Sequence, residues 1–368
     1  MNRQFRRMAS ELRREFRRIF HDEGMVVFLL IVPLAYPLLY SYLYSNQVVR
    51  DVPIVAIDNS NSYLSRTFLR MVDATPEVDV IRRVPNINEA KKAVAEGEAY
   101  GIIYLPEELN RRISQNNQTH ISIFCDMSGL LYYKSLLEAC TNISLTLNEE
   151  IRMERLSGLT AYEQKVQTTP ITYTEVAFFN PEKGFDSFLI PGILMLIIQQ
   201  TLLLGIGLKA GTDREKGIRW RKISVGRFSA YLLLYLFTTG ISIPVVNSMF
   251  GLEQTAGLLD LIIFLLFYIP ACIAFAFAAS RLVPNRESCM LIFVITSVPL
   301  LFLSGISWPA SNIPLWLKAI SYLFPSTFGI NGYIELQTMG ASLNVLLPQI
   351  IALGIQLIIY LFVASREK

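Results

Sequence analysis

The residues of this chain that are best suited to chemistry lie close together, between positions 209 and 222. Asp213 and Glu215 alternate there with basic side chains, namely Lys209, Arg214, Lys216, Arg219, Arg221 and Lys222. Interleaved charges of both signs supply neither a nucleophile with its base nor a set of metal ligands. They are suited instead to a charge-matched contact with a partner protein. The simpler alternative is that these charges only keep a loop in water.

Sequence motifs for nucleotide, metal and redox chemistry are missing from the 368 residues. The chain has no GxxxxGK[ST], HExxH or CxxC sequence, and its four cysteines and two histidines are widely spread. Without a P-loop the sequence lacks the usual cradle for nucleotide phosphates, and no paired carboxylates indicate an enzyme. We therefore expect no bound cofactor and no metal. A net charge of +3 is too small to indicate a nucleic-acid partner.

Other polar residues fit structural roles better than functional ones. His120 alternates with apolar isoleucines, as on the solvent face of a strand. Asp58 and Asp126 each follow an expected strand, where ligands can bind but where turn chemistry also places aspartate. Cys125 and Cys140 lie fifteen positions apart, and the sequence leaves open whether they form a disulfide.

Long apolar runs define the elements that must position these residues. Hydrophobic residues make up 52% of the chain and charged residues only 17%, which is unusual for a water-soluble domain. A helix needs about 20 apolar residues to span a bilayer. Six runs approach or meet this length, at 25–44, 187–208, 228–250, 258–280, 288–303 and 345–363. Because unpaired backbone amides are costly in lipid, the sequence predicts an α-helical integral membrane protein with six transmembrane helices.

Basic residues predict how these helices are oriented. Eighteen lysines and arginines lie in the segments 1–24, 209–227, 281–287 and 364–368, against one, Lys318, in 251–257 and 304–342. Positive charge is retained on the cytoplasmic side, so both termini and the loop 209–227 are expected there. Within 1–24, apolar residues recur every three or four positions among the arginines, which is typical of an amphipathic helix in the headgroup layer.

Residues 45–186 are expected to form an α/β domain on the opposite, extracytoplasmic side, inserted between the first two spans. Short apolar strands at 53–57, 78–81, 100–105 and 120–124 alternate with helical segments at 63–72, 88–97 and 107–113, and a long helix follows at 130–156. Alternating strands and helices favour a mainly parallel sheet.

Three motifs make the chain resemble the permease subunits of ABC-2 type exporters, of the bacterial kind with a large periplasmic domain after the first span. Asp213-Arg214-Glu215-Lys216-Gly217 is similar to that family's charged Arg-Glu-Lys-Gly signature. Ser304-Gly305, Trp308-Pro309, Pro314 and Pro325 together resemble its Ser-Gly and proline pattern before the last span. Asp58-Asn59-Ser60-Asn61 with Thr75-Pro76 is similar to the opening of its outer domain. Ile218 and Ile313 depart from the threonine and methionine usual in the family.

The resemblance implies roles for the first two motifs. In this family the charged loop forms a coupling helix that docks on a cytoplasmic ABC ATPase, which assigns that contact to Asp213, Arg214, Glu215, Lys216, Gly217 and Arg219. The segment 304–342 forms short re-entrant helices there. An outer gate would then include Ser304, Gly305, Trp308, Pro309, Pro314 and Pro325, although an interfacial aromatic belt explains the tryptophans as simply.

The resemblance also implies partners and a location. The chain would be the permease of a multidrug or lipid exporter in the bacterial inner membrane, without ATPase activity of its own. It would act with a separate ATPase subunit and with a second permease copy or close homologue, surrounded by membrane lipid. A periplasmic adaptor protein is a further candidate partner.

Polar residues within the apolar runs are candidates for a transport pathway. Gln199, Gln200 and Thr201 in the second run and Asn247 in the third are the clear hydrogen-bonding groups, although neutral amides also join helices to one another. No acidic or basic residue lies in the middle of a run, which argues against a secondary transporter. A membrane-anchored sensor or scaffold with a ligand-binding outer domain is the remaining alternative.

Overall fold

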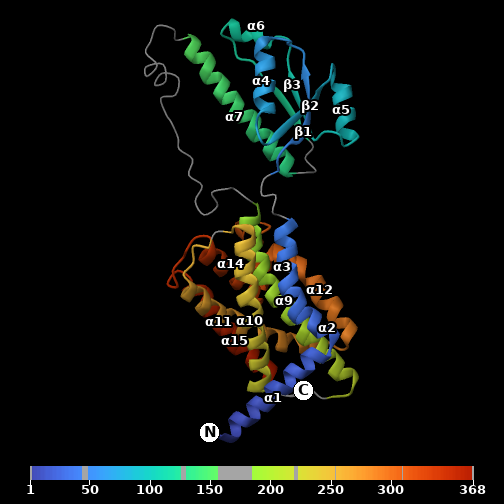
Figure 1. The fold of residues 1–368 in the computed structure, drawn as a ribbon, viewed down its shortest axis with the longest axis vertical. Helices are drawn as coiled ribbons and strands as arrows, with labels where there is room; N and C mark the ends of the chain where they lie inside the picture. Colours follow the sequence, from blue (N-terminus) through green and yellow to red (C-terminus); the bar gives the residue numbers. More distant parts are fainter. Residues whose placement is uncertain are drawn as a thin grey trace. The chain divides into compact units, whose positions relative to one another are not determined.

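The computed structural model describes residues 2–43, 49–125, 130–155, 185–218, 223–252, 254–308 and 310–366. Asp126, Arg219, Arg221, Lys222 and Pro309, all singled out above, lie outside the described residues. The chain divides into two compact units, a helical unit (Met1–Gln47 with Ala177–Lys368) and an α/β unit (Val48–Val176) (Figure 1).

The helical unit contains long apolar helices and several short ones. Its N-terminal part comprises α1 (Asn2–His21), α2 (Glu23–Val26), the π-helix η1 (Val27–Ile31) and α3 (Val32–Leu43). The remainder comprises α9 (Phe185–Glu215), α10 (Val225–Phe250), α11 (Leu258–Ala279), η2 (Ser280–Leu282), α12 (Arg286–Leu303), η3 (Ala310–Asn312), α13 (Leu315–Ser321), α14 (Pro325–Gln337) and α15 (Leu347–Ser365). Six helical segments of the described chain are long and apolar enough to cross a membrane: Glu23–Leu43, Leu189–Glu215, Val225–Phe250, Leu258–Leu282, Arg286–Leu303 and Leu347–Ser365.

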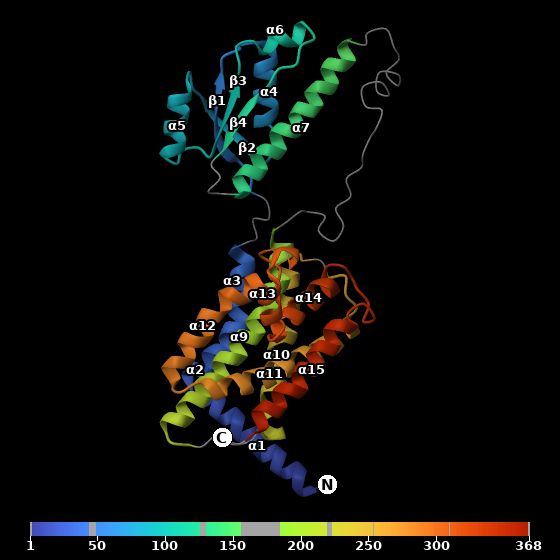
Figure 2. The same ribbon diagram turned by 180° about the vertical axis from the view of Figure 1, so that it is seen from behind.

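Helix α9 is the centre of this unit. It is buried along its apolar length and packs against α3, α11, α12 and α14 (Figure 2). Helices α12 and α15, in contrast, expose isoleucine, leucine and valine side chains, among them Ile295, Val298, Ile351 and Ile358. Apolar surface of this extent is unfavourable in water, so these two helices have the surface expected of helices in lipid.

A proline in the first long helix shows how the packing satisfies backbone groups. Pro37 has no amide hydrogen to donate to the carbonyl of Pro33, four residues earlier in α3. The Ser242 hydroxyl of α10 donates to that carbonyl at 3.2 Å. The neighbouring helix therefore stabilises a backbone group that the proline leaves unpaired, as membrane helices require.

The helix boundary that differs most from the sequence prediction is the end of α9. The expected loop 209–227 begins later, because α9 continues past Leu208 to Glu215 and α10 starts at Val225. Lys209, expected in the loop, is a buried residue of α9 that pairs with Glu15. The buried helix can continue through Lys209 because Glu15 supplies the opposite charge.

The α/β unit is a four-stranded sheet covered by helices. Its elements are β1 (Val52–Asp58), α4 (Tyr63–Asp73), β2 (Val78–Arg83), α5 (Ile87–Ala95), β3 (Gly101–Leu105), α6 (Leu109–Ser114), β4 (Ser122–Cys125) and α7 (Leu130–Arg155). The strand order is β2-β1-β3-β4; β1 is parallel to β2 and β3, and β4 is antiparallel to β3. The mainly parallel sheet expected from the alternating pattern is therefore present.

The two faces of the sheet carry separate cores. Val52, Ile54 and Ala56 pack with α4 and α7 on one face. Val55 and Ile57 pack with α5 on the other. Alternate residues of β1 thus face opposite layers, which explains why the strand is apolar from Val52 to Ile57.

Polar residues of this unit have mostly structural roles. Asp58 accepts hydrogen bonds from the Asn61 amide and the Ser65 hydroxyl, both at 2.9 Å, as turn chemistry predicts. His120 is exposed and precedes β4, so the strand begins later than expected. Among the described residues no disulfide joins Cys125 to Cys140, and the Cys125 thiol donates to the Tyr100 carbonyl at 3.3 Å. Burial raises the pKa of Cys140 to about 12.

Candidate functional site

The charged motif singled out in the sequence is the last turn of α9 and its cap. Gly217 has φ +66°, a left-handed conformation that glycine adopts without steric cost. The Ile218 amide donates to the Asp213 carbonyl at 2.8 Å, and the Gly217 amide donates to the Arg214 carbonyl at 2.9 Å. These two bonds form a Schellman motif. The turn at Lys216–Ile218 is therefore fixed to the end of the central helix.

Arg286 joins three segments beside this turn. Its guanidinium forms a bidentate ion pair with Asp22, with both N–O distances at 2.7 Å, and Nη1 also donates to the Thr212 hydroxyl at 2.9 Å. Asp22 is the N-cap of α2, Thr212 belongs to α9, and Arg286 begins α12. Donation from Arg286 lowers the pKa of Asp22, although burial opposes this shift. Glu215 of α9 also contacts Arg286, through the backbone amide of the arginine. We call Asp22, Thr212, Glu215 and Arg286 the α9 clamp.

The side chains of Glu215 and Arg214 contact their own chain. Glu215 accepts a hydrogen bond at 2.7 Å from the backbone amide of Arg286, at the start of α12. Arg214 donates at 2.7 Å to the carbonyl of Arg281, in the connection between α11 and α12. Gly211 allows this close approach, since a Cβ there would lie 2.6 Å from the Arg286 nitrogen. These two residues therefore anchor α9 to neighbouring segments.

The predicted coupling residues thus divide into two groups. Arg214 and the exposed Glu215 hold the end of α9 to the fold, as does their neighbour Thr212, which was not predicted. The Asp213 carbonyl caps the helix end, and Arg219 lies outside the described residues. Lys216 and Gly217 are exposed, as is the next residue, Ile218. Ile218 is 45% exposed and adds an apolar side chain to this charged turn. This exposed turn is the part of the motif that is available to a partner.

A second polar cluster lies beneath α1, and the sequence analysis did not find it. Glu15 is 2% exposed and pairs with Lys209 of α9. It also accepts from the Tyr231 hydroxyl at 3.2 Å and lies 3.7 Å from the Arg227 guanidinium, both on α10. We call these four residues the Glu15 cluster. It ties α1 to α9 and α10 by charged contacts in the interior.

The protonation state of Glu15 follows from its neighbours. Burial by itself raises the pKa of this carboxyl, but the charges of Lys209 and Arg227 and the hydrogen bonds from Lys209 and Tyr231 outweigh burial. The net result is a lowered pKa, so Glu15 is ionised at neutral pH. The sequence did contain a signal, since Met8, Leu12, Glu15 and Ile19 recur at helical spacing and place an acid on the apolar face of α1.

The predicted outer-gate residues lie around the short helices after α12. Ser304 is buried and donates to the Leu301 carbonyl at 2.6 Å, and Gly305 has φ +91°. Pro314 is the N-cap residue of α13, Pro325 is the first residue of α14, and Trp308 is exposed. Ser304 thus caps the end of α12, and the two prolines mark the starts of α13 and α14. The gating role of these residues stays a prediction.

Three of the four predicted pathway residues join helices to one another. Gln199 accepts from the Ser326 amide at the start of α14 (2.7 Å), Thr201 hydrogen-bonds the Tyr235 hydroxyl (2.8 Å), and Asn247 accepts from Gln337 of α14 (3.1 Å). Gln200 is different. It is 7% exposed, and neither atom of its amide has a hydrogen-bond partner among the described residues.

Gln200 borders a pocket of about 300 Å³ between α9, α12 and the η1–α3 segment. The lining is mainly apolar and aromatic, with Phe28, Tyr36 and Phe293 among its walls. Ser297 and Thr201 add two hydroxyl groups. The pocket therefore offers an apolar surface with a few polar groups, the composition expected for a site that takes an amphiphilic ligand.

These features define a multi-pass helical membrane protein. The chain belongs to the ABC-2 family of transporter proteins, whose sequence model matches residues 24–366. It is similar to ABC transporter G family member 20 of Dictyostelium discoideum, with 24% identity over 270 residues, and spans 36% of that protein's length. It is also similar to the probable multidrug ABC transporter permease YbhR of Escherichia coli, with 16% identity over 331 residues that cover 87% of each chain.

Proposed function

We propose that the chain is the membrane-spanning permease subunit of an ABC exporter. It moves a hydrophobic or amphiphilic molecule outward, using ATP that a separate cytoplasmic ATPase subunit hydrolyses. The observation that carries this proposal is the continuity of α9. One helix extends from Gln200 in the apolar pocket to the Glu215 end and its exposed turn, so a movement imposed at the turn reaches the pocket through a single rigid element.

The contacts of α9 support transmission of force from the end of this helix to its neighbours. The α9 clamp fixes its end to α2 and α12, and the Glu15 cluster fixes it to α1 and α10. An ATPase that pushes on Lys216–Ile218 would therefore move these helices together. The coupling contact assigned to Asp213, Arg214 and Glu215 then has two parts: the exposed turn meets the ATPase, and the side chains of Arg214 and Glu215, which bind neighbouring segments, distribute the displacement.

The pocket beside Gln200 is our candidate for part of the substrate pathway. Its apolar walls match a drug-like molecule or lipid, and the amide of Gln200, which has no hydrogen-bond partner among the described residues, offers a donor and an acceptor. YbhR, which the chain resembles over most of its length, is described as a probable multidrug permease. A second permease copy would complete the pathway, since the pocket is bounded by α12, which exposes much of its apolar surface.

The proposed topology has six spans in the bacterial inner membrane and both termini in the cytoplasm. The α/β unit then lies in the periplasm, where an adaptor protein is a candidate partner. The eighteen-to-one distribution of basic residues described above supports this orientation.

The proposal is tested by reconstitution. The chain is placed in liposomes with the ABC ATPase that co-purifies with it, and ATP-dependent movement of the fluorescent amphiphile Hoechst 33342 is followed. We expect movement only with both proteins and ATP, and we expect Glu215→Ala to insert normally while lowering the transport obtained per ATP hydrolysed. Glu287→Ala is the matched control, since Glu287 is an exposed carboxylate close to the same clamp. Transport by the chain in liposomes without the ATPase would contradict the proposal.

A further inference from the structure

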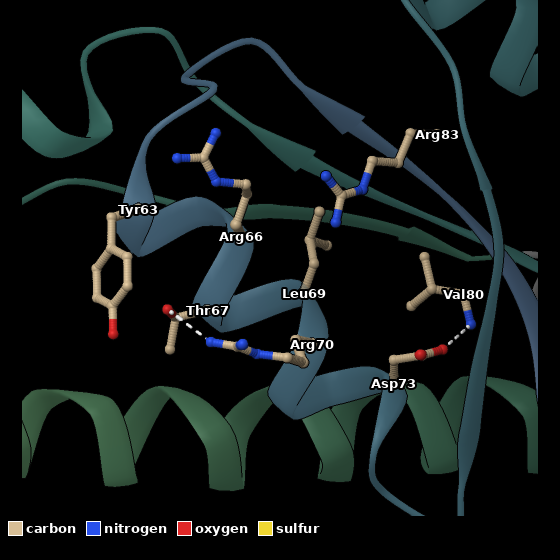
Figure 3. Close-up of a pocket in the computed structure, with 8 residues that line it drawn as sticks. All are labelled: Tyr63, Arg66, Thr67, Leu69, Arg70, Asp73, Val80 and Arg83. Atoms are coloured by element: carbon tan, nitrogen blue, oxygen red, sulfur yellow. Dashed lines mark hydrogen bonds between the residues drawn. The ribbon is translucent and has the colours of Figure 1, made fainter.

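The α/β unit carries an arginine-lined groove between helix α4 and the edge strand β2. The groove has a volume of about 430 Å³ and is lined by Arg66 and Arg70 of α4, Arg83 of β2, and five other residues (Figure 3). A volume of this size is within the range of small-molecule sites. The groove lies within a single compact unit, so its geometry does not depend on how the two units are arranged.

The three arginines come from facing elements. Arg66 and Arg70 are four residues apart on α4 and therefore lie on one helix face, and Figure 3 shows Arg83 extending from β2 with Leu69 between it and Arg66. The groove thus has cationic groups on two walls and an apolar floor. Tyr63 lies at the start of α4 and places an aromatic ring at one end.

A β-bulge in β2 turns Arg83 toward this groove. Ile54 of β1 is opposite Val80, but the next residue, Val55, is opposite Arg82, so Ile81 is an extra residue in β2. The bulge reverses the alternation of faces. Arg83 is then opposite Ala56, which faces α4, and Arg82 is opposite Val55, which faces α5.

The two adjacent arginines have different partners as a result. Arg82 pairs with Glu98 at 2.6 Å. In the described part of the chain, none of Arg66, Arg70 and Arg83 lies within ion-pair distance of a carboxylate. Arg66 donates to the Asn61 carbonyl (3.2 Å) and Arg70 to the Thr67 hydroxyl (3.4 Å), which are neutral acceptors.

One acidic residue, Asp73, also lines the groove. Its carboxylate accepts a hydrogen bond from the Val80 amide at 2.8 Å, and it lies at the opposite end of α4 from Tyr63 (Figure 3). Three positive charges therefore face one negative charge that is held against the backbone of β2. The groove retains a net positive charge.

We propose that this groove binds a phosphate-bearing ligand. A guanidinium presents planar pairs of donors that match phosphate oxygens. A phosphate ester has enough oxygens to contact arginines on both walls, whereas a carboxylate has two oxygens. The groove is larger than a bare phosphate, so the apolar floor at Leu69 and the ring of Tyr63 are available to the organic part. Free phosphate esters and lipid headgroups share this chemistry.

The test uses the full chain in a nonionic maltoside detergent and a phosphate-free buffer. Binding of glycerol 3-phosphate is measured by microscale thermophoresis, with glycerol as the uncharged control. We expect Arg83→Gln and Arg66→Gln each to weaken binding by about tenfold or more, because a charge-assisted contact is lost. Arg82→Gln is the matched control and should bind as the unmodified chain does. All four arginine side chains are at the surface, so circular dichroism should show the same fold in each variant.

A second arm separates the two sources of the ligand. Dihexanoyl phosphatidylglycerol, used below its micelle concentration, is compared with glycerol 3-phosphate. Tighter binding of the lipid that depends on Arg83 supports a headgroup site, and equal or weaker binding that depends on Arg83 supports a soluble phosphate ester. Failure of the unmodified chain to bind either probe overturns the proposal, as does equal binding by Arg83→Gln. Neither result bears on the proposed transport function, which rests on the helical unit.

Discussion

Arg286 and Asp22 form a bidentate ion pair that joins the start of α12 to the N-cap of α2, with both N–O distances at 2.7 Å. The pair links segments that are far apart in sequence, and Thr212 and Glu215 of α9 contact the same arginine. The end of the central helix is therefore held on two sides.

Asp22→Asn should destabilise the helical unit by about 1 kcal/mol, the value of a good but partly exposed ion pair. Asparagine still accepts the hydrogen bond from the Met25 amide, so the N-cap survives, whereas the negative charge and one of the two acceptors of Arg286 are removed. The melting temperature in detergent should fall by a few degrees. Arg7→Gln is the control, because the Arg7–Glu11 pair is exposed and its loss should have no measurable effect. Equal melting of Asp22→Asn and the unmodified chain would show that the clamp is not stabilising.

The Glu15 cluster predicts unequal effects for its two ion-pair partners. Glu15→Gln leaves Lys209 beside the charge of Arg227 without a carboxylate, whereas Lys209→Met leaves Glu15 with Arg227 and Tyr231. Removing one partner of a buried pair costs about 3–5 kcal/mol. We expect Glu15→Gln to be the more destabilising change, as measured by denaturant unfolding. The opposite order would mean that Lys209, and not Glu15, is central to the cluster.

The lowered pKa values of Asp22 and Glu15 predict a loss of stability in acid. A carboxyl with a lowered folded-state pKa contributes stability above its unfolded pKa and loses it as the pH falls through the folded value. Unfolded carboxyls titrate at about 4. The difference in melting temperature between the unmodified chain and Asp22→Asn should therefore be constant above about pH 5 and should narrow below about pH 4. A gap that widens in acid would contradict the lowered pKa.

The Schellman cap of α9 predicts a contrast between two glycines. Gly217 has φ +66° and Gly240 lies in the interior of α10, and an added Cβ meets no atom within 4 Å at either position. Gly217→Ala should cost about 1 kcal/mol of backbone strain. Gly240→Ala should be neutral or stabilising by up to about 1 kcal/mol. Melting temperatures of the two variants compare them directly, and a tolerated Gly217→Ala would show that the exposed turn is not fixed.

The apolar helices and the α/β unit could be predicted because their signals are local. Runs of about 20 apolar residues and alternating short strands are properties of neighbouring residues. The sequence predicts the end of α9 too early, because Lys209 resembles the start of a loop and its partner Glu15 is 194 positions away. The self-contacts of Glu215 and Arg214 were missed for the same reason. The sequence shows that a motif is charged, but it does not show which of the charged side chains contact the rest of the fold.

The pathway residues show a similar limit. Gln199 and Gln200 are adjacent and identical in type, yet Gln199 accepts from the start of α14 and Gln200 faces a pocket. Helix periodicity separates the two faces by about 100°, but only the packing of α12 and α14 shows which face is which. The sequence could therefore nominate both residues and distinguish neither.

Photo-crosslinking from the exposed turn shows whether Lys216–Ile218 contacts an ABC ATPase. p-Benzoylphenylalanine is placed at Ile218 in membranes of cells that make the full chain, and crosslinked proteins are identified by mass spectrometry. Trp316 of α13, an exposed aromatic residue at the other end of the helical unit, is the control position (Figure 2). We expect Ile218, and not Trp316, to crosslink to a protein with a P-loop ATPase sequence. Crosslinks to such an ATPase from Trp316, or none from Ile218, would contradict this expectation.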